Sequence, residues 1–334
     1  MDVYFFEVFE EEERALKQVL SRSVRARFTP HTVQRTGLKE PPAGLISIRT
    51  QSIIPPYWVP RLKGILTRST GYDHIQDFLK GVHKKIPCGF LPKYCARSVA
   101  EQVFLSILAL KRRLKRQMSQ FATFNRSGLT GGECAGARLL VVGVGAIGGE
   151  VVRLGRAMGM RIRGVDIVRR LRGLTYVSLK EGVRSSDVIV CTLPLTEKTR
   201  GLLCFALLEK APRGAIFVNI SRGEISPVKD LKRLLDEGIL SGLAMDVYED
   251  EKRLAEHLRF QKPPRTEAGK TILSLKKRDN VLFTPHNAFN TVEALKRKAR
   301  LSAESVVQFL RRGRFPHPIP EDRPETRDPR PETD

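Results

Sequence analysis

Cysteine is scarce in this sequence, and its spacing does not suggest pairing. The chain of 334 residues contains five cysteines, an odd number, and no two of them form a C-x-x-C motif. This pattern argues against a disulfide framework and against a zinc site, and it is typical of free thiols in a reducing compartment. We therefore expect no bound metal and a cytoplasmic protein.

Long apolar runs are also lacking. No unbroken apolar stretch approaches the roughly 20 residues that a transmembrane helix requires. The N-terminal stretch MDVYFFEVFEEEE is acidic, whereas a signal peptide begins with basic residues. We expect neither a membrane segment nor a signal peptide.

Acidic residues are too few to balance the basic ones. The 36 Asp and Glu residues stand against 59 Lys and Arg residues, which gives a formal net charge of +23. Such a charge attracts nucleic acids, phosphorylated metabolites and acidic surfaces. However, the basic residues are spread along the chain and no nucleic-acid-binding module is visible. We interpret most of them as a solvated surface and do not expect a nucleic-acid partner.

A glycine motif follows a buried strand in the middle of the chain. Residues 139–142 form a continuous apolar run, as in a strand that is buried on both faces. Gly143, Gly145 and Gly148 follow in the order G-x-G-x-x-G. In this context the three glycines permit a tight turn, the approach of backbone to a pyrophosphate, and close packing of a helix on the strand. The motif predicts a dinucleotide site.

An acidic residue defines the expected cofactor further. A second predicted strand, residues 162–165, ends at Asp166. A carboxylate at this position can accept hydrogen bonds from an adenosine ribose diol and would repel a 2′-phosphate, so we expect NAD. The neighbouring Arg169 and Arg170 leave some tolerance of a 2′-phosphate open.

Strands and helices alternate along the chain, which is typical of parallel α/β layering. A chain of this length predicts two domains. We expect a doubly wound parallel sheet of the Rossmann type over 98–290. We expect a smaller, flavodoxin-like α/β substrate domain formed by 1–97 with 291–315, and a disordered tail over 316–334. Further strands are predicted over 3–9, 44–48, 62–67, 176–178, 188–192, 216–220, 243–247 and 281–284, and helices over 10–20, 98–121 and 293–310.

Three reactive side chains follow later strands of the predicted Rossmann domain: Arg222, Glu251 and His286. Ligands of open α/β sheets bind at the carboxyl ends of the strands, so the three side chains are expected near the cofactor. An imidazole can take the hydroxyl proton as hydride leaves carbon, and a carboxylate can orient that ring. A guanidinium can hold a substrate carboxylate. The set predicts hydride transfer to or from a hydroxy acid.

These residues lie in motifs that resemble the D-isomer-specific 2-hydroxyacid dehydrogenase family. The resemblance covers roughly residues 62–310 and includes the stretches GVGAIGGEV, DVIVCTLPLTEKTRGLL, FVNISRGE, LAMDVYEDE and LFTPHNAF. It implies an NAD-dependent enzyme that interconverts a D-2-hydroxy acid and a 2-oxo acid in a cleft that closes on the substrate. It also implies a homodimer that forms through the nucleotide-domain helices.

The resemblance implies a role for each matching residue. His286 is expected to be the acid–base group, Glu251 its partner and Arg222 the substrate anchor. The substrate carboxylate is expected on backbone N–H groups of Thr70, Gly71 and Tyr72, with Tyr94 nearby. The implied cofactor contacts are Gly143, Gly145, Ala146, Ile147, Gly148, Asp166, Leu193, Pro194, Thr199, Ile220, Ser221, Arg222 and Asp246.

Two alternatives remain open on the sequence. A protein that senses NADH on the same fold and recruits nucleic acid or an acidic partner would suit the charge of +23. A phosphorylated hydroxy acid would suit basic residues near the substrate, with Arg49, Arg68 and Arg97 as the candidates.

Overall fold

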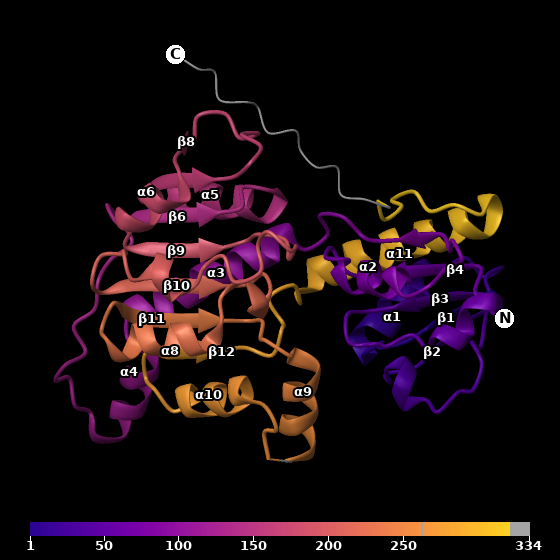
Figure 1. Ribbon diagram of the computed structural model, residues 1–334, viewed down its shortest axis with the longest axis horizontal. Helices are drawn as coiled ribbons and strands as arrows, with labels where there is room; N and C mark the ends of the chain where they lie inside the picture. The colour runs from indigo at the N-terminus through magenta and orange to yellow at the C-terminus, as the bar shows by residue number, and fades with distance from the viewer. Residues whose placement is uncertain (262, 321–334) are drawn as a thin grey trace. The chain divides into compact units, whose positions relative to one another are not determined.

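The computed structural model describes residues 1–261 and 263–320, which divide into two compact units (Figure 1). Unit 1 comprises Met1–Tyr94 with the described residues from Thr291 onward, and unit 2 comprises Cys95–Asn290. The sequence predicts domain boundaries after residues 97 and 290, and the two units of the structure divide after residues 94 and 290. Among the described residues, no helix is both long and apolar enough to span a membrane.

Unit 1 contains a parallel five-stranded sheet in the order β2-β1-β3-β4-β5. This is the flavodoxin-like strand order 2-1-3-4-5, as predicted. All residues of β3 and β4 are buried, which explains why their sequences are continuously apolar or small. The strands are β1 (Val3–Phe5), β2 (Ala26–Phe28), β3 (Leu45–Ile48), β4 (Gly64–Thr67) and β5 (Cys88–Gly89). The helices are α1 (Glu10–Val19), α2 (Asp73–Lys80) and α11 (Val292–Arg312), with the short 3₁₀ helices η1 (Val33–Arg35) and η2 (Pro56–Arg61).

The segment after α11 is ordered as far as it is described, which corrects the interpretation of a tail that is disordered from residue 316. Phe315 and Ile319 are only 5% and 7% exposed. The amide of Phe90 donates to the carbonyl of His317, and the amide of Ile319 donates to the carbonyl of Cys88. The segment therefore pairs with the edge strand β5, a contact that its polar composition concealed. Residues 321–334 lie outside the described part of the chain.

Unit 2 contains a parallel seven-stranded sheet in the order β12-β11-β10-β9-β6-β7-β8. Its strand order reverses between β6 and β9, as in a doubly wound Rossmann fold. Both strands at this switch point are buried, from Leu139 in β6 and throughout β9. The strands are β6 (Arg138–Val142), β7 (Arg161–Val165), β8 (Thr175–Tyr176), β9 (Val188–Cys191), β10 (Ala215–Asn219), β11 (Leu240–Met245) and β12 (Val281–Phe283).

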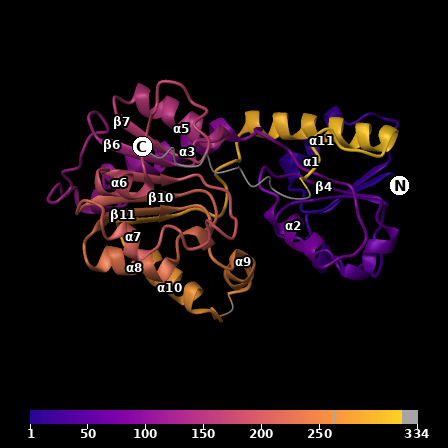
Figure 2. The same ribbon diagram turned by 45° about the horizontal axis from the view of Figure 1, so that its top comes forward.

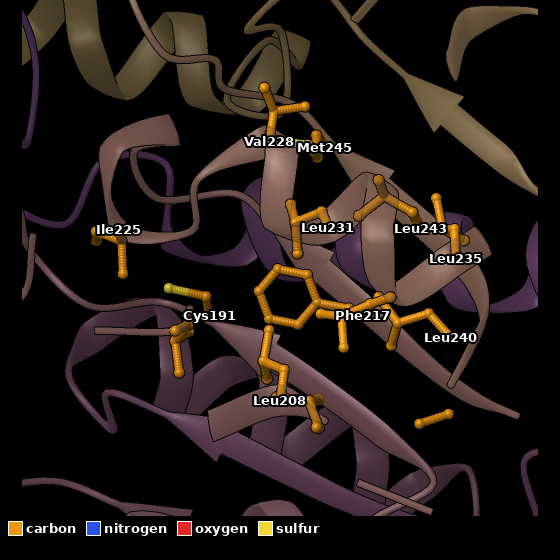
Figure 3. Close-up of a cluster of buried hydrophobic side chains, with 14 of the residues drawn as sticks. Cys191, Leu208, Phe217, Ile225, Val228, Leu231, Leu235, Leu240, Leu243 and Met245 are labelled. Carbon is orange, nitrogen blue, oxygen red and sulfur yellow. The ribbon is translucent and has the colours of Figure 1, made fainter. Parts of the chain in front are cut away.

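Helices cover both faces of this sheet (Figures 1 and 2). Helices α3 and α5 pack against each other, while α6, α7, α8 and α10 make successive contacts with one another. The core beneath α8 is built around Phe217 and Leu231, with Cys191 at its edge (Figure 3). The helices are α3 (Ala96–Lys111), α4 (Leu114–Gln120), α5 (Ala146–Ala157), α6 (Leu179–Arg184), α7 (Phe205–Leu208), α8 (Val228–Asp236), α9 (Glu251–Phe260) and α10 (Glu267–Lys276), with 3₁₀ helices η3 (Phe121–Thr123) and η4 (Gly223–Ile225).

The single helix predicted over 98–121 is two helices, α3 and α4. Arg113 adopts a left-handed conformation with φ +52°, which ends the regular hydrogen-bond ladder. The carbonyl of Lys111 instead accepts a hydrogen bond from the amide of Gly132. This partner lies far along the chain, so periodicity could not indicate the break.

Two other predicted elements also differ from the structure, and two short strands were not predicted. The strand expected over 3–9 ends at Phe5, because Glu7 has φ +58°. The region 251–280, interpreted as one helix and a loop, contains both α9 and α10. The short strands β2 and β5 were not predicted, since two or three residues carry too little periodicity.

Candidate active site

The glycine motif forms the turn between β6 and α5. Gly143 has φ +97°, and a Cβ there would lie 2.9 Å from backbone atoms of Thr192 and Leu193. A Cβ on Gly148 would lie 2.0 Å from the carbonyl oxygen of Gly143. Neither position has room for a side chain, so both glycines are required by packing and backbone conformation.

Gly145 differs from the other two glycines. A Cβ there would meet nothing within 4 Å, and the residue immediately precedes the 12-residue helix α5. Open space at a helix N-terminus suits an anion, because the first amide groups have no partner within the helix and the dipole is positive there. The turn therefore fits the pyrophosphate of NAD, with exposed Ala146 and half-buried Ile147 beside it.

Asp166 lies at the end of β7, beside this turn. One carboxylate oxygen accepts a hydrogen bond from the amide of Val144 at 2.6 Å, and the other accepts one from the amide of Val168 at 2.9 Å. Each oxygen can accept a second bond, so the carboxylate is oriented and still able to bind ribose hydroxyls.

Hydroxyl groups tie the neighbouring strand ends together. The Thr192 hydroxyl donates to the carbonyl of Gly143, and the Ser221 hydroxyl donates to the carbonyl of Leu193. The Thr199 hydroxyl donates to the carbonyl of Pro194 at 2.7 Å. Hydrogen bonds thus connect several expected cofactor residues at this edge of the sheet: Gly143, Leu193, Pro194, Thr199 and Ser221. Thr192 was not predicted, although a hydroxyl directly after a buried strand was a signal for it.

The turn after β10 is held by Asn219, which is fully buried. Its amide oxygen accepts from the amide of Ser221 at 3.0 Å, and its amide nitrogen donates to the carbonyl of Arg222 at 2.9 Å. A Cβ on Gly223 would lie 2.0 Å from the Tyr248 backbone. Ile220 and Ser221 are buried and Arg222 is half-buried, so the arginine backbone is fixed on both sides.

His286 and Glu251 are in direct contact. The Nδ1 atom of His286 lies 2.7 Å from Oε1 of Glu251, and the two side chains are 26% and 21% exposed. Glu251 is the first residue of α9, and His286 follows β12 with φ +52°. A positive φ is uncommon for histidine, and such strain persists where the surrounding structure enforces it.

Asp246 holds the turn that carries His286. Its carboxylate accepts hydrogen bonds from the amides of Asn287 and Ala288 at 2.8 and 2.9 Å and from the Thr284 hydroxyl. Asp246 is only 2% exposed, and burial raises the pKa of this carboxyl. These three bonds fix the carboxylate and leave it acceptor capacity, so the cofactor contact that the resemblance implies for Asp246 stays a prediction.

Arg222, Glu251 and His286 thus follow β10, β11 and β12, three adjacent strands of one sheet. Of the three, Glu251 and His286 are joined by a hydrogen bond, while the Arg222 guanidinium donates to the carbonyl of Ser221 at 2.8 Å. Within residues 1–261 and 263–320, no group of three or more His, Cys, Asp or Glu side chains is placed to hold a metal ion.

The expected substrate residues lie in unit 1. The Thr70 hydroxyl donates to the carbonyl of Leu91 at 3.2 Å, and the Gly71 carbonyl accepts from Ser69. The ring of Tyr72 packs on Phe90. Tyr94 is 5% exposed.

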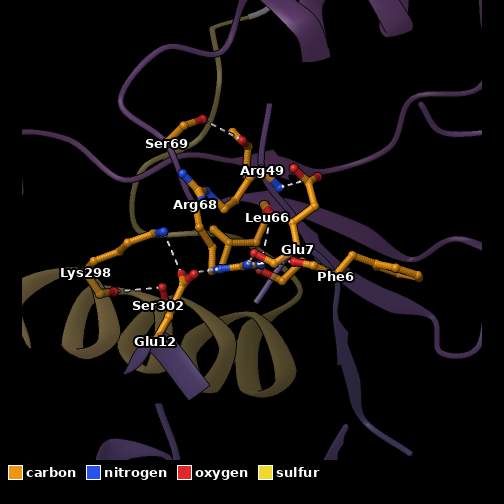
Figure 4. Close-up of polar contacts among 11 residues, drawn as sticks. Phe6, Glu7, Glu12, Arg49, Leu66, Arg68, Ser69, Lys298 and Ser302 are labelled. Carbon is orange, nitrogen blue, oxygen red and sulfur yellow. Dashed lines mark hydrogen bonds and ion pairs between the residues drawn. The ribbon is translucent and has the colours of Figure 1, made fainter. Parts of the chain in front are cut away.

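Arg68 is not available for a phosphorylated substrate, which corrects one of the alternatives. It is fully buried and pairs with Glu12 at 2.9 Å (Figure 4). Arg97 pairs with Glu101 at 2.6 Å. Two of the three basic candidates are therefore engaged within the protein.

Comparisons with known proteins identify the family. The model of the NAD-binding domain of D-isomer specific 2-hydroxyacid dehydrogenases matches residues 104–288. Glyoxylate reductase from Korarchaeum cryptofilum is 30% identical over 268 residues, which are 77% of this chain and 75% of the reductase. D-lactate dehydrogenase from Escherichia coli is 32% identical over 241 residues, which are 70% of this chain and 72% of that enzyme.

A solved structure is similar over most of its length. The D-lactate dehydrogenase from Aquifex aeolicus, complexed with NAD and lactic acid, superposes with a TM-score of 0.81 and 31% identity, over 92% of this chain and 95% of that chain. The protein belongs to the D-isomer-specific 2-hydroxyacid dehydrogenase family and is an NAD-dependent oxidoreductase that interconverts D-2-hydroxy acids and 2-oxo acids.

Proposed function

We propose that His286 is the general acid–base group of this reaction. In the reducing direction its imidazolium donates a proton to the oxo oxygen, and in the oxidising direction its neutral ring takes the hydroxyl proton. The nicotinamide cofactor, when bound, accepts or supplies the hydride at the carbon that bears this oxygen. Because Nδ1 is engaged by Glu251 at 2.7 Å, Nε2 is the ring nitrogen that exchanges the proton with the substrate.

Glu251 supports this role in two ways. Its carboxylate keeps a proton on Nδ1 of His286, which leaves Nε2 able to accept one, and its negative charge stabilises the imidazolium form. The Nδ1–Oε1 contact of 2.7 Å is the observation that carries the proposal. Asp246 contributes as a positioning residue, because its carboxylate accepts hydrogen bonds from the two backbone amides that follow His286.

Arg222 is proposed as the anchor of the substrate carboxylate, which a guanidinium can bind through two parallel hydrogen bonds. Asn219 and the close packing of Gly223 support this role by fixing the Arg222 backbone. From the family resemblance we carry over a second set of carboxylate contacts, the backbone amides of residues 70–72, with Tyr94 nearby. The proposed cofactor contacts are the residues that the resemblance implies: Gly143, Gly145, Ala146, Ile147, Gly148, Asp166, Leu193, Pro194, Thr199, Ile220, Ser221, Arg222 and Asp246.

The substrate is proposed to be a small, unphosphorylated 2-oxo acid. The relatives include a glyoxylate reductase and a D-lactate dehydrogenase, and also a D-3-phosphoglycerate dehydrogenase. The burial of Arg68 removes one basic candidate for holding a phosphate and so favours an unphosphorylated acid. The test is NADH oxidation with glyoxylate, pyruvate, hydroxypyruvate and a branched 2-oxo acid, followed by chiral analysis of the product. We expect turnover with at least one acid and, where the product is chiral, the D configuration. Binding of NADH without turnover on any of them, together with salt-dependent retention on nucleic acid, would favour the sensing protein instead.

A homodimer is also proposed. Large apolar side chains are exposed along α3, α4 and η3 and at the residue that follows η3, and such a concentration is typical of an interface. They are Leu105, Leu108, Leu114, Met118, Phe121 and Phe124, of which Phe121 is 75% exposed. A second copy is the proposed occupant because the family resemblance implies dimers through helices of the nucleotide domain, to which α3 and α4 belong. Light scattering of the wild-type protein is expected to give twice the mass of one chain. The Phe121→Lys/Phe124→Lys variant is expected to give the mass of one chain.

We propose a cytoplasmic location, supported by the state of the cysteines. None of the five cysteines, all of which lie in the described part of the chain, forms a disulfide, and four of them are buried. Thiols in this number are typical of a reducing compartment.

A further inference from the structure

A chain of hydrogen bonds runs beside the proposed substrate loop, residues 70–72. The Nε2 atom of His74, at the start of α2, lies 2.9 Å from Oγ1 of Thr67. This hydroxyl lies 2.7 Å from Oγ of Ser69, which in turn donates to the carbonyl of Gly71 at 2.6 Å. Thr67 is the last residue of β4 and is fully buried.

The direction of these bonds follows from the number of protons. A hydroxyl group has one proton to donate. The Ser69 hydroxyl donates to the Gly71 carbonyl, so it must accept a hydrogen bond from Thr67. The Thr67 hydroxyl donates to Ser69, so it must accept a hydrogen bond from Nε2–H of His74. Because Nε2 carries a proton in one neutral tautomer and in the imidazolium, the chain persists whether or not His74 is charged.

The consequence concerns the peptide unit between Gly71 and Tyr72. A peptide unit is planar and trans, so its carbonyl and its amide point in opposite directions. Holding the carbonyl of Gly71 therefore also sets the direction of the Tyr72 amide. Glycine has the widest conformational freedom of all residues, so this peptide would otherwise be the least determined of the loop.

The residues on the near side of the loop are already fixed. The Arg68 guanidinium donates to Glu12 at 2.9 Å and to the carbonyl of Phe6 at 2.7 Å (Figure 4). The carbonyl of Ser69 accepts from the amide of Leu91 at 3.1 Å. The hydroxyl chain thus acts on a loop whose base is rigid, and its effect is confined to Gly71 and Tyr72.

We propose that His74, Thr67 and Ser69 are positioning residues that orient the substrate-binding amide of Tyr72. This inference rests on the proposed function, which assigns the backbone of residues 70–72 to the substrate carboxylate. None of the three side chains needs to touch the substrate or NAD. Their loss should therefore weaken capture of the 2-oxo acid without changing the affinity for NADH.

The test is steady-state kinetics of Thr67→Val, an isosteric change at a buried position. The loss of one hydrogen bond is expected to raise KM for the 2-oxo acid about 3- to 10-fold, with kcat and the Kd of NADH within about twofold of wild type. Thr67→Ser keeps the hydroxyl and is expected to restore KM. His74→Leu is expected to behave like Thr67→Val, and it carries the same test if the buried substitution prevents folding.

Thr36→Val is the matched control. The Thr36 hydroxyl also donates to a backbone carbonyl of unit 1, that of Val33 at 2.7 Å, but it has no bond to the loop. Its KM is expected to equal that of wild type. A wild-type KM in both Thr67→Val and His74→Leu overturns the inference, as does an equal rise in Thr36→Val. If wild type itself reduces no 2-oxo acid, the proposed function fails instead.

Discussion

Nδ1 of His286 lies 2.7 Å from Oε1 of Glu251, although the two residues are 35 positions apart in the chain. The backbone of His286 adopts φ +52°, and the next two amides are bound by the carboxylate of Asp246. The structure thus maintains an unfavourable backbone conformation at the residue to which we assign proton transfer. The bonds from Asp246 are what support this conformation, and with it the direction of the imidazole.

His286→Ala should abolish turnover with little effect on cofactor binding. Loss of an acid–base group lowers kcat by about 10²- to 10⁴-fold. The expected measurement is single-turnover oxidation of NADH, with the Kd of NADH from fluorescence titration as the control. A parallel loss of NADH affinity would mean that His286 belongs to the cofactor site rather than to proton transfer.

Glu251→Gln should lower kcat with little effect on the binding of NADH. The amide side chain can still accept a hydrogen bond from Nδ1 of His286, but it carries no negative charge to offset the charge of the imidazolium. We expect kcat for 2-oxo acid reduction to fall about tenfold or more, measured by steady-state oxidation of NADH with the Kd of NADH as the control. A wild-type kcat in this variant would contradict the pairing.

Two glycine substitutions should separate cofactor binding from folding. Gly145→Ala adds a Cβ with no atom within 4 Å, so the protein should fold normally but lose NADH affinity by about tenfold or more, or ~1.4 kcal/mol. Gly148→Ala places a Cβ 2.0 Å from the Gly143 carbonyl oxygen and should lower thermal stability as well. Wild-type affinity in a folded Gly145→Ala variant would argue against pyrophosphate at this turn.

Glu12→Gln should destabilise unit 1. Burial acts to raise the pKa of Glu12, but Lys298 and Arg68 outweigh it and lower the pKa to about 2. The amide would leave the buried Arg68 guanidinium, and Lys298 below pH 7 where it is protonated, without an anion, at a cost of about 3–5 kcal/mol. Trp58, the single tryptophan, is fully buried in unit 1, so its fluorescence during urea unfolding is the measurement. A loss below about 1 kcal/mol, as for exposed pairs, would show that the charges are solvated.

Lys298 should make the stability of unit 1 depend on pH. Burial lowers its pKa to about 7 from an ordinary value of 10.5, although Glu12 lies 2.6 Å away. Between these values the unfolded chain binds the proton that the folded protein has released, so the Lys298 contribution to the unfolding free energy rises with pH. Lys298→Met should remove this rise. Urea unfolding of both proteins at pH 7 and pH 9.5, followed through Trp58, checks the difference.

Much of unit 2 could be predicted because its signals are local. The apolar run of β6 and the three glycines after it define a strand, a turn and a helix within about a dozen residues. Strand ends in a parallel α/β sheet share one edge, so the sequence alone indicated that Arg222, Glu251 and His286 would stand along it. NAD was predictable from Asp166 because a carboxylate at the end of this strand can bind ribose hydroxyls and repels a 2′-phosphate.

The remaining features depend on contacts between distant residues. The break at Arg113 involves Gly132, and the segment around Ile319 is ordered through β5. The burial of Arg68 requires Glu12, and the bond chain at Gly71 requires three side chains to face one another. The sequence by itself determined the class of fold, the cofactor and the reactive residue types, because these follow from periodicity and motif spacing. Only the tertiary structure decided which polar groups are paired, since pairing depends on the distance between atoms that the chain brings together in folding.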